Sequence, residues 1–248
     1  QVNVKTPCRG TGSAGFGALC VWLVAFHQLE NSEKGYSPEL WRKMADLGWL
    51  GILFPSRYGG ANGTLVDQMA LSEEIGRAVL PSPILTSTVL SGLMLINTGS
   101  EEQKARILPQ MARGDAIVTL AMAEPSGWLD DTPVGVHVIP DGASYIINGT
   151  KNWITNGSSA SVYLVIAQTD IEKGNKGINV FIIEKGMDGF VIGPKENKLG
   201  IRGSDTHSLM FTDVKVPKEN RIGDDGFGFT FAMKVLSGGR IGIGSQAL

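Results

Sequence analysis

The stretch Lys151-Asn152-Trp153-Ile154-Thr155-Asn156-Gly157 carries more information than any other part of the 248-residue chain. It follows directly on the alternating segment Tyr145-Ile146-Ile147-Asn148-Gly149, a pattern typical of a β-strand. At the lip of a strand, the indole would offer a flat face to a planar ring, and the Thr hydroxyl a hydrogen bond beside it. The pair could therefore hold a flavin. A core Trp with a Thr that caps a turn is an equally open interpretation.

The composition of the chain argues against several classes of protein. With 22 basic and 24 acidic residues and no run of like charge, it lacks the basic excess of a nucleic-acid binder. The two cysteines, Cys8 and Cys20, lie near the N-terminus and predict neither a disulfide framework nor a metal-ligand cluster. No histidine is spaced with a second ligand, so we expect no metal site. A chain of this length can bury a sizeable core.

Residues 1–29 differ from the rest of the chain. Gly15 to Phe26 is an apolar stretch of about a dozen residues, too short to span a bilayer but similar to the apolar region of a secretory signal. Against a signal, the chain begins with Gln1, and no small-residue cleavage site follows the apolar stretch. We interpret 1–29 as an atypical leader, with secretion as the alternative, and expect no membrane span.

Residues 37–113 have helical periodicity. Ser37-Pro38-Glu39-Leu40 predicts a helix start with Ser37 as N-cap. Ser100 and Gln103 have capping-box spacing and predict the start of the last helix of this region. Between these two helices we expect a turn over 55–60 and helices over 66–76 and 84–98.

The pattern changes near Ile117, where short runs rich in Val, Ile, Tyr and Phe begin to alternate with turn residues. This continues to about Ile222 and predicts an all-β insert, a small barrel or sandwich. The candidate strands are Val118–Met122, Val134–Pro140, Ser144–Asn148, Val162–Gln168, Asn179–Glu184, Phe190–Ile192 and Ser208–Pro217. After Gly226 the chain becomes helical again, and Leu248 lies within this predicted helix.

Several segments, taken in order, resemble the acyl-CoA dehydrogenase family over roughly residues 31–248. Besides the Trp-x-Thr segment they are Ala123-Glu124-Pro125, Leu199–Thr206, Phe211–Pro217 and Leu236–Ile243. The resemblance implies an α+β fold, in which a helical domain precedes a β barrel or sandwich and the first helix of a truncated helical bundle. The expected division is a leader at 1–29, a helical domain at 30–116, a β domain at 117–222 and the start of the C-terminal bundle at 223–248.

The resemblance also implies FAD as the cofactor. In the family, the segment Tyr-x-x-Thr-Glu-Pro-Gly-x-Gly-Ser-Asp binds the flavin through its backbone and its Thr. Leu120, Met122 and Ala123 match the cofactor side of this segment, and Glu124, Pro125 and Asp130 keep its pattern.

Four replacements depart from that family segment. Ala123 stands where the family has Thr, which should remove one hydrogen bond worth about 1 kcal/mol. Leu120 replaces an aromatic residue, Trp128 a Gly and Leu129 a Ser. Trp128 could fill space that the acyl thioester or its pantetheine arm needs.

Trp153, Ile154 and Thr155 match the family's Trp-x-Thr, in which the Trp covers one face of the flavin and the Thr approaches its reactive nitrogen. On the substrate side the resemblance points to three positions, Leu129, Ser237 and Arg240; an Asp is common in the family where this chain has Ser237.

Arg202 lies in the segment Gly200–Thr206, which matches a turn near the cofactor and the subunit interface in the family. It could clamp a phosphate of CoA or FAD. Equally, it could pair with a local acid such as Asp205.

The activity implied is α,β-dehydrogenation of an acyl-CoA, with hydride transfer to flavin and electrons passed to an electron-transfer flavoprotein. The family's catalytic carboxylate, which removes the α-proton, lies in the C-terminal bundle beyond residue 248, so no catalytic residue is assigned. Glu73 and Glu74 are expected on a solvated helix face.

Two alternatives stay open because of the replacements at Leu120, Ala123, Trp128 and Leu129. One is a non-catalytic partner subunit of a hetero-oligomer, and the other is a flavin-free binding protein. A homo- or hetero-oligomer, a dimer or tetramer, is expected because the family's FAD spans a subunit interface. The bacterial cytoplasm or an organelle matrix would suit a chain without disulfides.

Overall fold

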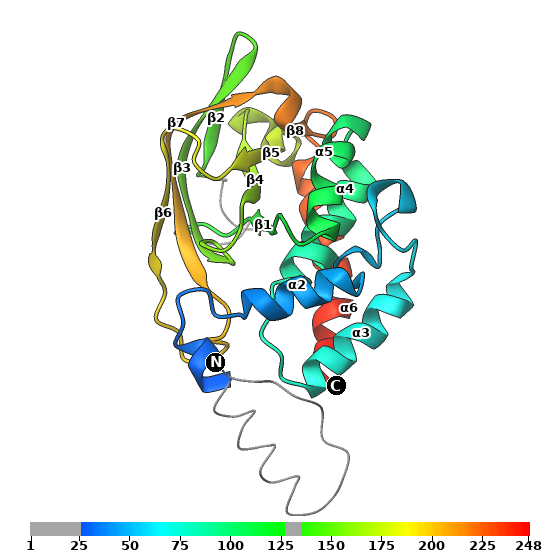
Figure 1. The fold of residues 1–248 in the computed structure, drawn as a ribbon. Helices are drawn as coiled ribbons and strands as arrows, with labels where there is room; N and C mark the ends of the chain where they lie inside the picture. The colour runs from blue at the N-terminus through cyan, green and yellow to red at the C-terminus, as the bar shows by residue number, and fades with distance from the viewer. Residues whose placement is uncertain (1–25, 127–134) are drawn as a thin grey trace, which may run out of the picture.

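The computed structural model of the chain describes residues 26–126 and 135–248. A group of helices packs against one side of a mixed β-sheet (Figure 1). Along the chain, helices come first, strands follow, and one long helix comes last. This is the predicted fold class, which is thereby confirmed.

The helices of the N-terminal part begin where the sequence encodes caps. Ser37 accepts a hydrogen bond from the amide of Leu40, and Ser100 forms the predicted capping box with Gln103. Thr64 forms a second capping box, with Asp67, that the sequence analysis did not predict. The segments are α2 Pro38–Asp46, two 3-10 turns at Trp49–Gly51 and Ser56–Tyr58, α3 Leu65–Arg77, a π-helix at Leu85–Gly92, α4 Leu93–Thr98 and α5 Glu101–Ala112.

The eight strands form one sheet in the order β6-β7-β3-β2-β4-β5-β8, with β1 paired in parallel to β4. Their bounds are β1 Val118–Ala121, β2 His137–Asp141, β3 Ser144–Thr155, β4 Val162–Gln168, β5 Ile178–Glu184, β6 Phe190–Lys195, β7 Thr206–Pro217 and β8 Arg221–Ile222. The end strands β6 and β8 do not pair with each other in the described part of the chain, so the sheet is not closed into a barrel.

Strand β3 is longer than predicted and includes the Trp-x-Thr segment. The strand was expected to end at Asn148, where the turn residues Asn-Gly begin. Instead, Gly149 adopts a φ of 133° at a register shift, and the strand continues to Thr155. A Cβ at Gly149 would lie 2.8 Å from the Cα of Val136, so only glycine fits at this irregularity.

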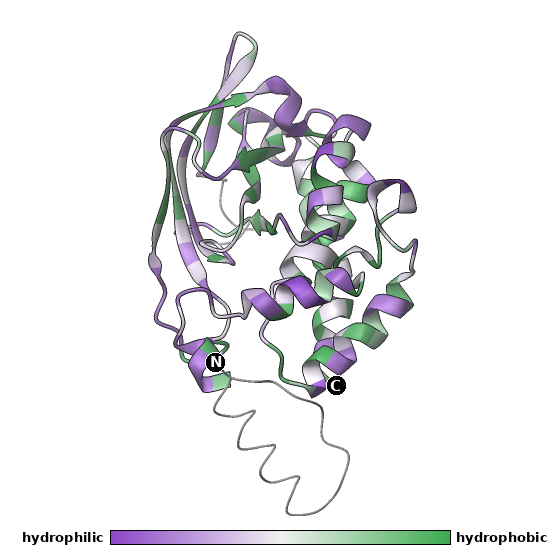
Figure 2. Ribbon diagram, in the orientation of Figure 1, coloured by the Kyte–Doolittle hydropathy of each residue, from purple (hydrophilic) through white to green (hydrophobic). Residues whose placement is uncertain are grey.

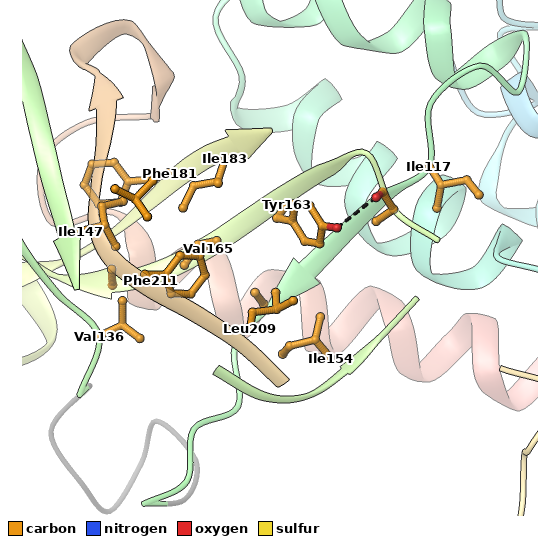
Figure 3. Packing of buried hydrophobic residues seen from close by; sticks show 14 of the residues in the cluster. Ile117, Val136, Ile147, Ile154, Tyr163, Val165, Phe181, Ile183, Leu209 and Phe211 are labelled. Carbon is orange, nitrogen blue, oxygen red and sulfur yellow. Dashed lines mark hydrogen bonds between the residues drawn. The ribbon is translucent and has the colours of Figure 1, made fainter. Parts of the chain in front are cut away.

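Strand β4 contributes side chains to two apolar cores, and all seven of its residues are buried. The side chains of Val162, Leu164 and Ile166 contribute to the core shared with α5 and α6. Those of Tyr163 and Val165 contribute to the core shared with α2, β3 and β7 (Figure 3). Burying one such aliphatic side chain stabilises the fold by roughly 1.5–3 kcal/mol.

The last helix, α6 Gly228–Ala247, packs against α3 and the π-helix. At the α3 contact, Gly76 leaves room for the carbonyl of Gln246. Hydrophobic and hydrophilic residues alternate along most of the helices (Figure 2), as expected when each buries one face. Within residues 26–126 and 135–248, no helix is long and apolar enough to cross a membrane, and no cluster of His, Cys, Asp and Glu could hold a metal ion.

Candidate functional site

A break in strand β3 sets the directions of Trp153 and Thr155. The register with β7 shifts between Lys151 and Ile154, and the φ of Trp153 is 55°, in the left-handed region. Lys151 before the shift and Ile154 after it are both buried, whereas Trp153 and Thr155 are exposed. Trp153 as a residue is 55% exposed. The interpretation of Trp153 as a core residue is therefore wrong.

The backbone conformation of Trp153 is unfavourable for a bulky residue. A non-glycine residue in a sparsely populated region costs on the order of 1–3 kcal/mol, and such residues cluster at ligand sites. More than half of the surface of Trp153 stays exposed, where a ligand can reach it. The geometry at Trp153 therefore favours a binding role over a structural one.

The end of β1 lies beside this part of β3. The hydroxyl of Thr119 donates to the carbonyl of Thr155 at 2.6 Å, and the amide of Asn152 donates to the carbonyl of Ala123 at 2.9 Å. Met122 and Ala123 are buried and Leu120 is half-buried. The six residues predicted to bind the cofactor thus lie in two neighbouring segments, Leu120–Ala123 and Trp153–Thr155.

A buried ion pair joins these two segments. Nζ of Lys151 lies 2.6 Å from Oε1 of Glu124 and also donates to the carbonyl of Met122 at 3.1 Å. The Glu124 carboxylate accepts further hydrogen bonds from the amides of Gly135 and Val136. The two side chains are 0% and 6% exposed. Burial lowers the pKa of Lys151 to about 8, although the charge of Glu124 acts in the opposite direction.

This ion pair was not predicted, although the sequence carries a signal for it. Tyr145, Ile147 and Lys151 occupy alternate positions of one strand, so Lys151 falls on its inward face. A lysine at an inward position needs a buried acceptor, because an unpaired buried charge is costly. Glu124 in the Ala123-Glu124-Pro125 segment is that acceptor.

The turn after β3 is held by Asp205. Its carboxylate is fully buried and accepts from the amides of Ser158 at 2.9 Å and Ser159 at 3.1 Å. The Ser159 hydroxyl and the side-chain amide of Asn156 also donate to it. Asp205 therefore fixes the chain immediately after the Trp-x-Thr segment, a role that the sequence analysis missed.

Arg202 does not pair with Asp205, as one interpretation had it. Its guanidinium donates to the carboxylate of Glu30 at 2.9 Å. The Asp205 carboxylate is instead occupied by the donors of the 156–160 turn. The local partner predicted for Arg202 was therefore wrong.

Two of the three residues predicted for the substrate side, Ser237 and Arg240, lie on α6. Ser237 donates to the carbonyl of Met233 within α6, and Arg240 is exposed. Among the described residues, neither makes a hydrogen bond to β1 or β3. Leu129, with Trp128 and Asp130, lies outside the described residues. Glu73 and Glu74 both pair with Arg77 on the surface of α3, as expected for a solvated face.

Two protein-family models match the sequence. Residues 23–115 match the acyl-CoA dehydrogenase N-terminal domain, and residues 119–214 match the acyl-CoA dehydrogenase middle domain. A short-chain specific acyl-CoA dehydrogenase of Clostridium acetobutylicum is 43% identical over 209 residues, which cover 84% of this chain and 55% of the relative. The chain spans about half the length of the curated relatives that it matches.

Solved structures resemble the fold closely. An acyl-CoA dehydrogenase of Bacillus anthracis complexed with FAD gives a TM-score of 0.81 at 32% identity, covering 90% of this chain and 39% of that one. A chain from a structure of the electron-transferring flavoprotein of Acidaminococcus fermentans gives a TM-score of 0.80 at 38% identity, covering 85% of this chain and 56% of that one.

Proposed function

This chain belongs to the acyl-CoA dehydrogenase family, and we propose that the whole protein is an FAD-dependent enzyme that dehydrogenates a short-chain acyl-CoA between its α- and β-carbons. The observation that carries the proposal is the outward-facing pair Trp153 and Thr155, held on a bulged strand beside Met122 and Ala123. The short acyl chain is supported by the name of the Clostridium acetobutylicum relative, which is short-chain specific.

The donor set of the described residues fits a flavin. The exposed Trp153 indole offers a flat apolar surface to the ring system, and the exposed Thr155 can donate to the edge of the ring. Met122 and Ala123 have buried side chains and can contribute through their backbone, as can Ile154, while Leu120 contributes apolar contact. When bound, the FAD would accept the hydride that leaves the β-carbon. The cofactor itself is supported by the FAD complex of the Bacillus anthracis relative.

On the substrate side we propose roles for Leu129, Ser237 and Arg240, on the strength of the family resemblance. Arg240 is exposed on α6, where its guanidinium could meet an anionic group. A carboxylate of the C-terminal bundle would remove the α-proton.

Four further proposals follow from family membership. The acceptor of the electrons is an electron-transfer flavoprotein, which the Acidaminococcus fermentans structure supports. The protein works as a homo- or hetero-oligomer, in the bacterial cytoplasm or an organelle matrix. The domain division is 30–116, 117–222 and 223–248, after a leader at 1–29. The boundary near 116 is supported by the end of one family match at 115 and the start of the other at 119, whereas the first match begins at 23, before the end of the leader.

A second candidate function is a non-catalytic partner subunit. It is favoured by one specific observation: Ala123 lacks the hydroxyl with which the family's Thr contacts the flavin. Such a subunit would bind the cofactor but would not oxidise an acyl-CoA.

The visible absorption spectrum of the purified whole protein separates these functions. It should be recorded after addition of FAD and removal of the excess, and again after addition of butyryl-CoA. A flavin band that bleaches is the result we expect. A band that persists would favour the partner subunit, and absence of any band would overturn both.

A further inference from the structure

The peptide group between Met122 and Ala123 is held by Lys151. Nζ of Lys151 donates to the carbonyl oxygen of Met122 at 3.1 Å, from a position with no solvent exposure. In a trans peptide the N–H points in the direction opposite to the C=O. The amide N–H of Ala123 therefore points away from the buried ammonium group.

The next peptide group is fixed as well. The carbonyl of Ala123 accepts from the amide of Asn152 at 2.9 Å, so both peptide planes around Ala123 are set from strand β3. Ala123 has no side-chain hydroxyl, so its main-chain amide is the one donor that this residue can offer to a ligand.

We propose that Lys151 is a positioning residue for the flavin: by holding the carbonyl of Met122, it turns the amide of Ala123 toward the polar edge of the cofactor. This inference rests on the proposed function, since it presumes that the site between Leu120–Ala123 and Trp153–Thr155 takes FAD. It assigns to the inward lysine a role beyond that of stabilising the fold.

The partner of Lys151 allows this role to be separated from plain structural support. Glu124 accepts from Lys151 and from the amides of Gly135 and Val136, and makes no hydrogen bond with Met122 in the described residues. Glu124→Gln removes the ion pair and puts an NH₂ group where Oε2 accepts from the Gly135 amide, so its stability is measured alongside its affinity. It keeps the lysine on the Met122 carbonyl. Lys151→Met breaks the ion pair and also frees that carbonyl.

The experiment is an FAD titration of the apo form of the whole protein, followed by quenching of flavin fluorescence. Lys151→Met should weaken FAD binding by about tenfold or more and shift the flavin absorption band, because the Ala123 donor is no longer oriented. Glu124→Gln should bind within about threefold of the wild type. Lys215→Met is the matched control, since it removes a lysine from an exposed pair with Asp141.

The double variant Lys151→Met/Glu124→Gln leaves no unpaired buried charge and carries the test if the single lysine variant does not fold. It should show the same loss of affinity as Lys151→Met. The inference is overturned if a folded variant without Lys151 binds FAD as the wild type does, or if Glu124→Gln is equally damaging. If the wild type itself binds no FAD, both the proposed function and this inference are overturned.

Discussion

The hydroxyl of Thr119 on β1 donates to the main-chain carbonyl of Thr155 on β3 at 2.6 Å, and Thr119 is fully buried. Among the described residues, the main chain of β1 pairs with β4 and not with β3. The Thr119 side chain therefore links β1 to β3, the strand that carries Trp153. Thr119→Val keeps the shape of the side chain but leaves the Thr155 carbonyl without its donor. We expect the free energy of unfolding to fall by about 1–3 kcal/mol in urea denaturation. The exposed Thr212→Val should change it by less than about 0.5 kcal/mol, and equal effects would contradict the role of Thr119.

Replacement of Trp153 by glycine should separate binding from stability. Glycine adopts the φ of 55° without strain, and this relief offsets the packing lost with a residue that is 55% exposed. The free energy of unfolding should therefore stay within about 1 kcal/mol of the wild type. The affinity for FAD should fall at least about tenfold, because the stacking surface is gone. Thermal unfolding and FAD titration measure the two effects.

The control for Trp153→Gly is Trp41→Gly. Trp41 is buried, and its Nε1 donates to the carbonyl of Gly114. This variant should lose about 3–5 kcal/mol of unfolding free energy. A comparable loss at Trp153 would mean that its indole is structural after all.

The buried Lys151 should make the protein more stable as the pH rises above about 8. Its pKa is about 8 in the folded protein, whereas an unfolded lysine titrates near 10.4. Between these values the unfolded chain binds one proton more than the folded chain, so the contribution of Lys151 to the unfolding free energy rises with pH. The rise should approach about 1.4 kcal/mol per pH unit.

This pH effect is measured as the difference in unfolding free energy between the wild type and Lys151→Met, at pH 7.5 and again at pH 9.5. Because the variant has no group that titrates at position 151, the difference isolates the lysine. The free energy of unfolding of the wild type should rise relative to that of the variant as the pH rises. A difference that stays constant would show that the folded pKa is not depressed.

Asp205→Asn should destabilise the turn after β3. The carboxylate accepts four hydrogen bonds, two at each oxygen. An amide in its place would direct its NH₂ group either at the main-chain amides of Ser158 and Ser159 or at the side-chain donors of Asn156 and Ser159. We expect a loss of at least about 2 kcal/mol in urea denaturation. Asp188→Asn changes an exposed carboxylate in the same way and should have almost no effect. Similar losses for the two variants would argue against Asp205 as the anchor of the turn.

The parts of the fold that the sequence predicts well are those with a local cause. Ser37 and the pair Ser100 and Gln103 start helices because their side chains meet amides only three residues away. Strand β4 was predicted with its observed bounds because it is a continuous apolar run. The two-residue strand β8 was missed, since it exists only through its pairing with β5.

The same distinction holds for the candidate site. The Trp-x-Thr segment could be recognised because its residue types are unusual side by side. The partner of Lys151 is 27 residues away, and that of the 156–160 turn is nearly 50 residues away. These pairings depend on strand order and register, and neither is encoded by a pattern within one segment.

Strand β4 places restrictions on how this protein can change over time. Its even-numbered residues must suit α5 and α6, while its odd-numbered residues must suit α2, β3 and β7. A recombination event that imports this strand from a distant relative would have to match two independently varying sets of neighbours at once. Compensating substitutions would then be needed in both cores together. The residues of β4 should therefore be substituted more slowly than those of helices that face one core.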